Sequence, residues 1–164
     1  NDSNDILHYI DQSHGNKFPR EGEDAEQDKW MKFSNDILGK SIVAVIYKNY
    51  RTSLHALDYV TKVDKFSLKD RIVSKWLGAI VMGMIGRSRA KMFDEPPRTN
   101  LQTQLDSMSS GIEGEFFGGK GPNGADFANY GILRSMQGLN GFDIVEKHNV
   151  IWPWYNRMQV LSNI

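Results

Sequence analysis

Asn123 and Asp126 are the two polar residues whose spacing carries the clearest chemical meaning in this sequence. They follow the Gly-rich turn 118–122, and an asparagine at such a point can accept hydrogen bonds from the first amides of a helix. An acid three residues later can reach back to the asparagine's own amide, which completes a capping box. The pair predicts a helix start and a stabilisation on the order of 1 kcal/mol, so Asp126 is a structural residue rather than a catalytic one.

The other residues that could do chemistry form no catalytic or metal-binding pattern. The four histidines are His8, His14, His55 and His148. They lack the i, i+4 spacing of helical metal ligands, and the sequence contains neither a GxSxG elbow nor a P-loop. The chain also has no cysteine, which excludes a thiol nucleophile or a cysteine zinc site within it. We therefore assign no catalytic residue and no metal ligand.

The length, charge and cysteine content of the chain limit the classes of protein to which it can belong. The chain has 164 residues, 40% of them hydrophobic, which suits one domain with a buried core. Twenty basic residues balance twenty acidic ones, so no broad cationic field is present to attract nucleic acid. The lack of cysteine favours a reducing compartment. We expect an intracellular protein without a nucleic-acid partner, either cytoplasmic or held at a membrane by an anchor upstream of Asn1.

The spacing of apolar residues predicts the helices that position the polar residues described above. From Trp30 to Ile46 apolar side chains recur every three or four positions, which favours a helix, although the β-branched stretch 41–47 leaves a strand open for its second half. The run Trp76–Gly86 is the most apolar of the chain and predicts a buried helix with Trp76 in the core. Its 11 residues are well short of the roughly 20 that span a bilayer.

The second half of the chain predicts further helices and no sheet. A helix is expected from Trp152, with Pro153 in its first turn and Trp152 in the core. No hairpin chemistry and no internal repeat is present, so the expected fold class is all-α with one core. The clearest amphipathic stripe follows 4-3-4-4 spacing up to the Gly-rich turn and consists of Leu101, Leu105, Met108, Ile112 and Phe116.

Residues 116–139, FFGGKGPNGADFANYGILRSMQGL, resemble the C-terminal helical domain of glutathione transferases. Within that superfamily, YGILRSMQGLNGFD and WPWYNRM are most similar to the membrane-associated prostaglandin E synthase type 2 family. The likeness covers most of residues 29–158. Further points of similarity are Lys29-Trp30, residues 50–52 and residues 55–60.

The resemblance implies an all-α bundle like the C-terminal domain of glutathione transferases, behind a thioredoxin-like half with a Cys-Pro-x-Cys motif. Residues 1–18 then form the end of the thioredoxin-like domain, 19–28 a linker and 29–164 the helical domain. The polar, breaker-rich composition before Trp30 agrees with a linker. Because the reactive thiol lies outside this sequence, the chain alone is expected to be inactive.

The resemblance also implies which residues meet ligands. Asp2 and Ser3 match the acidic residue and serine that receive the γ-glutamyl end of glutathione, and a serine hydroxyl and helix amides suit that carboxylate. Trp30 and Phe33 lie on the helix that faces the thioredoxin-like half, so we expect them to bind an apolar or lipid-like substrate. Lys40, in a segment that differs from the family's histidine and Ser-Pro-Asn turn, is a candidate for meeting a substrate carboxylate, and the alternative is a lysine exposed to solvent.

Two hypotheses follow from different classes of function. In the first, the chain is the helical half of a glutathione-dependent isomerase or transferase, and it supplies one cleft wall and the surface of a homodimer. The family's reaction is the isomerisation of prostaglandin H2 to prostaglandin E2, with glutathione and, in some members, haem as cofactors. In the alternative, the domain is a non-catalytic dimerisation or scaffolding module of the same fold. A thiol motif in the upstream sequence would favour the enzyme.

Overall fold

The computed structural model describes residues 25–48, 53–54, 57 and 68–162 of the chain. The described part is helical, and its one β-type feature is an isolated bridge between Phe116 and Gly119. The all-α prediction is therefore confirmed. The helical elements are α2 (Ala25–Phe33), the π-helical turn η1 (Ser34–Leu38), α3 (Gly39–Ile46), α5 (Leu68–Ala90), α6 (Pro97–Ser109), α7 (Gly124–Arg134), α8 (Phe142–Glu146) and α9 (Ile151–Ser162).

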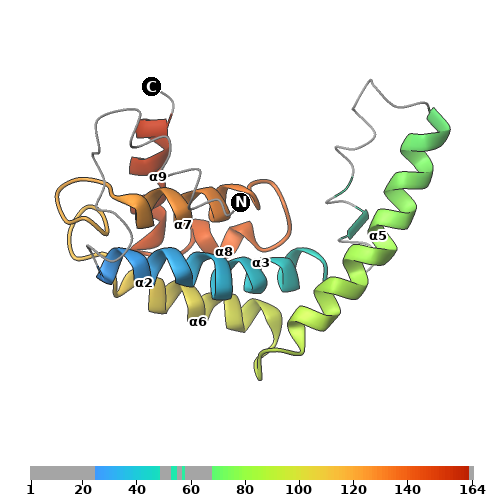
Figure 1. Cartoon of the computed structure of the whole chain (residues 1–164), viewed down its shortest axis with the longest axis horizontal. Coiled ribbons are helices and arrows are strands. Elements are labelled where there is room, and N and C mark those ends of the chain that lie inside the picture. Colours follow the sequence, from blue (N-terminus) through green and yellow to red (C-terminus); the bar gives the residue numbers. More distant parts are fainter. Residues whose placement is uncertain (1–24, 49–52, 55–56, 58–67, 163–164) are drawn as a thin grey trace.

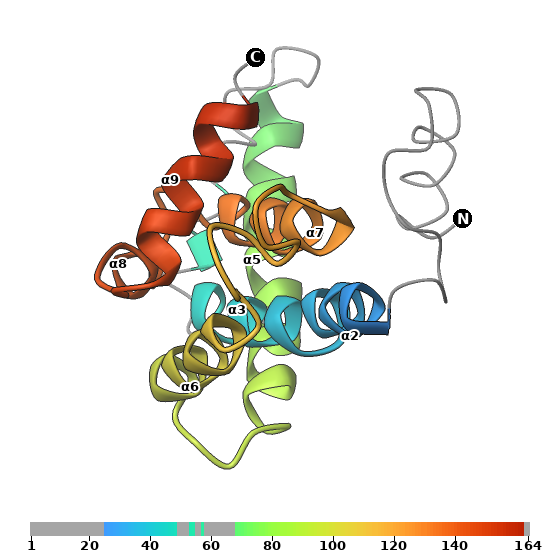
Figure 2. The same ribbon diagram turned by 90° about the vertical axis from the view of Figure 1, so that its left-hand side faces the viewer.

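The elements α2, η1 and α3 run on from one another and form the central rod of the bundle. The residues at the junctions keep right-handed helical backbone angles, and Gly39 donates its amide to the Ser34 carbonyl, the i→i+5 bond of a π-helix. The predicted helix from Trp30 is thus confirmed, and the β-branched stretch after Ser41 is helical. Figures 1 and 2 show the rod between α6 on one side and α7 on the other.

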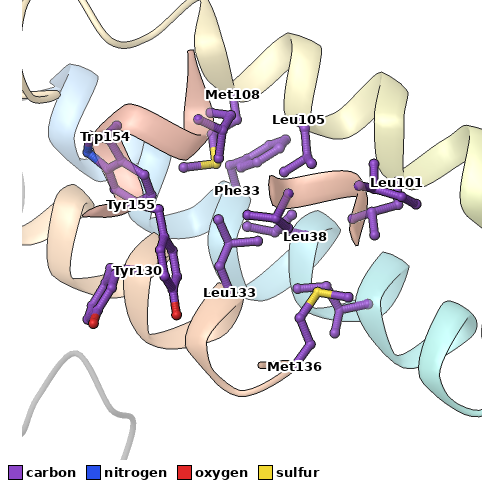
Figure 3. Close-up of a cluster of buried hydrophobic side chains, with 14 of the residues drawn as sticks. Phe33, Leu38, Leu101, Leu105, Met108, Tyr130, Leu133, Met136, Trp154 and Tyr155 are labelled. Atoms are coloured by element: carbon purple, nitrogen blue, oxygen red, sulfur yellow. The ribbon is translucent and has the colours of Figure 1, made fainter. Parts of the chain in front are cut away.

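The core lies where this rod meets α6, α7 and α9 (Figure 3). Leu101, Leu105 and Met108 of α6 are fully buried, as the apolar spacing predicts. From the far end of the sequence, α9 inserts Trp154 and Tyr155, which are also fully buried. Pro153 lies in the first turn of α9, where its missing amide costs no helical hydrogen bond, so the predicted helix start is confirmed.

The stripe expected to continue from Leu101 to Phe116 ends early. Helix α6 begins with Pro97 at its first position and ends at Ser109, so Ile112 and Phe116 lie beyond it. Gly111 explains the change, because a Cβ atom at this position would clash with the ring of Trp30. The chain turns beneath that ring, and Phe116 still reaches the core from the following loop.

Helix α5 lies at the edge of the molecule and packs across α3 (Figure 1). The prediction of a buried helix with Trp76 in the core is wrong, because half of the Trp76 side chain is exposed. The small residues Ala79, Gly83 and Gly86 are the buried ones. Gly86 lies so close to the Tyr47 carbonyl that a Cβ atom would clash with it, and this contact turns the small face of α5 inward.

Two predictions fall at the start of the chain. Helix α2 begins at Ala25, inside the segment 19–28 that the sequence marks as a linker. Asp2 and Ser3, the expected glutathione contacts, lie outside the described residues, so the domain division and the glutathione contacts both stay predictions. No helix among those the structure describes combines the length and the apolar character needed to cross a bilayer.

Candidate functional site

The capping box at the start of α7 has the geometry that the sequence predicts. The Asn123 side-chain oxygen accepts from the amides of Ala125 at 3.0 Å and Asp126 at 3.3 Å. In return, Asp126 Oδ2 accepts from the Asn123 amide at 2.9 Å. Asp126 is fully buried. The box explains why α7 begins at Gly124, directly after the Gly-rich turn.

Asp126 also has two partners that its spacing to Asn123 does not reveal. Its Oδ1 atom accepts from the amide of Phe117 at 3.1 Å and from the indole Nε1 of Trp154 at 2.7 Å. Three N–H groups therefore converge on one buried carboxyl group, which offsets the cost of removing it from water. The side chain joins the loop, α7 and α9, and it has no exposed surface to meet a substrate.

Side-chain amides tie α2 to α7 at the same place. Gln27 Oε1 accepts from the amide of Gly124 at 2.9 Å. Asn129 Nδ2 donates to the carbonyls of Trp30 at 3.1 Å and Ala125 at 2.9 Å. Both side chains are buried, and no pattern in the sequence around them singled them out. The start of α7 is therefore a structural junction, in agreement with the structural role predicted for Asn123 and Asp126.

Trp30 and Phe33, two of the expected substrate contacts, are largely core residues. Their rings meet edge to face with centroids 5.2 Å apart, and Trp30 also packs on Phe117 at 5.3 Å. Figure 3 shows Phe33 directed toward Met108 of α6. The small exposed remainder of both rings borders a hollow of about 470 Å³, which is also lined by Lys29, Lys32, Asp36, Ile37 and Ser107.

Lys40, the third expected substrate contact, lines a different and larger hollow. This hollow measures about 890 Å³ and lies between α3, α5 and the end of α7. Most of its walls are apolar, and the polar groups include Ser135 and Gln137. Its apolar lining consists of Ile42, Val43, Ile46, Met82, Ile85, Ile132 and Leu139. The structure thus does not bring Lys40 together with Trp30 and Phe33, and we call the larger space the α3–α5 hollow.

Among the described residues, two cations and no acidic residue line the α3–α5 hollow. Lys40 pairs with Asp36 one turn earlier, with Nζ and Oδ1 3.5 Å apart. Arg89, on the inner face of α5, has one described side-chain hydrogen bond, from Nη1 to the sulfur of Met92 at 3.4 Å. Sequence reasoning missed Arg89, although its place at the end of an apolar helix is a recognisable signal. Apolar walls with a few cations suit a ligand that has an apolar body and an anionic group.

The described residues do not fit haem, the second cofactor that the family resemblance implies. His148 is the one histidine in the described part, and it is 8% exposed. Its Nε2 lies 3.0 Å from Asp106 Oδ1, and its Nδ1 accepts from the amides of Val150 and Ile151. Both nitrogens are therefore engaged, and the described residues also contain no group of three or more metal-ligating side chains. Haem has no part in the function that we propose below.

The fold and the junction at α7 define the class of this protein. The described helices form an all-α bundle, which is consistent with the C-terminal helical domain of glutathione transferases. The chain is 33% identical to Prostaglandin E synthase 2 of Mus musculus over 139 residues, and 31% identical to Prostaglandin E synthase 2 of Danio rerio over 147 residues. The chain therefore belongs to the prostaglandin E synthase 2 family.

The two alignments differ in how much of each protein they cover. They include 82% and 87% of this chain, but 36% and 39% of the mouse and zebrafish proteins. The chain thus spans somewhat more than a third of the length of these relatives. No protein-family model matches it.

Proposed function

We propose that this chain is the helical half of a glutathione-dependent enzyme of the prostaglandin E synthase 2 type, and that the α3–α5 hollow forms part of its substrate cleft. The observation that carries the proposal is the agreement between family membership and the chemistry of this hollow. A lipid with an anionic group matches apolar walls that hold Lys40 and Arg89. Lys40 would meet the substrate carboxylate, as the sequence predicts.

The proposed division of labour leaves the reacting groups to sequence outside this chain. Thiolate chemistry needs a cysteine of lowered pKa, and the chain contains none. Glutathione would be bound mainly by the thioredoxin-like half, with Asp2 and Ser3 at its edge. This chain would contribute apolar contact surface, a cation for the substrate's anionic group and exclusion of water.

The experiment compares residues 1–164 with a protein extended upstream through the thioredoxin-like half. Glutathione-dependent turnover of a lipid endoperoxide is expected for the extended protein and not for residues 1–164. In the extended protein, Lys40→Ala should raise KM for a substrate with a carboxylate but not for its methyl ester. Lys147→Ala, at an exposed lysine that does not line the hollow, is the matched control. Activity of residues 1–164 alone would overturn the division of labour.

The alternative function is a dimerisation or scaffolding module without catalysis. The observation that favours it is the broad apolar surface that α5 exposes, where a second copy could bind. The homodimer is itself a prediction from the family resemblance. If the extended protein neither binds glutathione nor turns over an endoperoxide, the scaffold is the better description.

A further inference from the structure

The outward face of α5 is a continuous apolar surface in contact with solvent. Its large side chains are between 48% and 59% exposed. They recur at three- and four-residue spacing, so they share one side of the helix. We call this surface the α5 stripe. It consists of Val73, Trp76, Leu77, Ile80, Val81 and Met84.

The α5 stripe is not the uncovered edge of the bundle core. The opposite side of α5 already packs on α3 through the buried residues Ala79, Gly83 and Gly86. These small residues let the two backbones approach closely, and Gly86 touches Tyr47. Rotating α5 to bury the stripe would push large side chains into that contact. The described residues of the bundle therefore leave the stripe exposed.

The charge along α5 is mostly positive. Residues 68–93 contain six basic residues and one acidic residue, Asp70, although the whole chain is balanced at twenty of each. Arg87 follows Met84 after three residues, so it continues the same side of the helix, and Lys91 lies in the turn directly after the end of α5. Both are exposed. The outward side of α5 thus passes from large apolar groups to cations.

We propose that the α5 stripe binds the surface of an anionic phospholipid bilayer. Helix α5 would lie in the interface, with the stripe among the upper acyl chains and with Arg87 and Lys91 at the phosphate groups. From the sequence we expect a membrane anchor upstream of Asn1. The α5 stripe would add a second contact with the membrane. The proposal does not depend on the substrate of the α3–α5 hollow, whose cations are Lys40 and Arg89.

A second copy of the chain fits the α5 stripe less well than an anionic membrane. In an isologous dimer the same surface meets itself. Two copies of a segment with six basic residues and one acidic residue, the segment 68–93, would then approach each other, and like charges oppose that association. An anionic bilayer satisfies both features of the surface, because it offers a hydrocarbon layer and negative headgroups together.

Vesicle co-sedimentation of residues 1–164 tests the proposal. Binding is expected with vesicles of phosphatidylcholine and phosphatidylserine, and it should weaken with rising salt and be much weaker with phosphatidylcholine alone. The pair of changes Leu77→Ser and Met84→Ser should abolish binding. Arg87→Gln should weaken it roughly fivefold. Val160→Ser, at a 69% exposed valine on α9, is the matched apolar control and should leave binding unchanged.

The remaining outcomes contradict the proposal. Equal binding to neutral and anionic vesicles would show that charge has no part, and no binding to either would exclude a lipid surface. Sedimentation velocity distinguishes the second copy: a dimer that Leu77→Ser and Met84→Ser dissociate would assign the stripe to self-association. Circular dichroism of the variants should match that of the parent, because the changed side chains are exposed. Loss of helicity in the double variant would refute the description of the stripe as an outer surface.

Discussion

The start of α7 and the outer face of α5 differ in how their side chains are surrounded: the first buries a polar group among partners, and the second exposes apolar groups to solvent. At α7, the carboxyl group of Asp126 is fully buried and accepts hydrogen bonds from the loop, from α7 itself and from α9. On α5, large apolar side chains such as Leu77 meet solvent, and the contacts with α3 use small residues. The comparison separates a polar group whose partners all lie within the described residues from an apolar surface that the described residues leave exposed.

The largest loss of stability is expected from removing the carboxyl group of Asp126 at the start of α7. Asp126→Ala leaves three N–H groups without their acceptor, those of Phe117, Asn123 and Trp154. The free energy of unfolding should fall by about 3 kcal/mol, because each buried donor without a partner costs about 1–3 kcal/mol. Urea denaturation followed by circular dichroism measures the change. A midpoint equal to that of the parent would show that Asp126 does not hold this junction.

The next effect concerns the inner face of α5. Gly86→Ala places a methyl group against the carbonyl of Tyr47, so the free energy of unfolding should fall by about 1–3 kcal/mol. The matched control is Gly131→Ala within α7, where no atom lies within 4 Å of the new methyl group. That change should raise stability by about 0.5–1 kcal/mol. Equal results for the two glycines would mean that α5 does not pack closely on α3.

A smaller, pH-dependent effect is expected at the contact between α6 and α8. Arg98 Nη2 donates to Asp143 Oδ2 at 2.6 Å, and this bond is the main cause that lowers the pKa of Asp143, with burial acting in the opposite direction. Such a group stabilises the fold above its unfolded pKa, and this contribution is lost as the pH falls through the folded pKa.

Asp143→Asn should therefore cost about 0.5 kcal/mol at neutral pH, because both side chains are 42% exposed and the pair is screened by water. The difference from the parent should shrink as the pH falls below about 4. Denaturation midpoints at a series of pH values measure it. If the stability difference between Asp143→Asn and the parent stays constant down to acidic pH, the loss would come from side-chain packing rather than from the charge of Asp143.

The smallest effect is expected on the α5 stripe. Leu77→Ser changes a side chain that is 59% exposed, so the free energy of unfolding should stay within about 0.5 kcal/mol of the parent. Thermal denaturation of the protein without lipid measures this. A loss comparable to that of Gly86→Ala would place Leu77 in the core and would remove the contrast between the two faces of α5.

The start of α7 could be predicted better than the outer face of α5, because the capping box depends only on residues that are close together in the sequence. The box at Asn123 and Asp126 is a four-residue pattern, and its geometry follows from the helix start alone. The bond from Trp154 to Asp126 joins residues 28 positions apart, and no spacing rule reaches that far. The all-α fold and the helix at Pro153 were predictable for the same local reason.

Trp76 shows why burial was misjudged. The apolar character of a side chain indicates that it favours contact with other apolar groups. It does not indicate whether those groups belong to the same chain. The large residues of α5 are the apolar ones, yet glycine and alanine determine which side of the helix can approach α3. The family resemblance likewise placed Trp30, Phe33 and Lys40 at one substrate, whereas the structure places them on two separate hollows.

The bond between Gln27 and Gly124 has a consequence for the order in which the chain folds. The capping box joins residues three apart, while this bond closes a loop of 97 residues and must overcome a larger loss of chain entropy. The box can therefore form early, and the docking of α2 on α7 should come after the rate-limiting step. Gln27→Ala should leave the refolding rate nearly unchanged and accelerate unfolding, whereas slower refolding in stopped-flow measurements would place this docking in the folding nucleus.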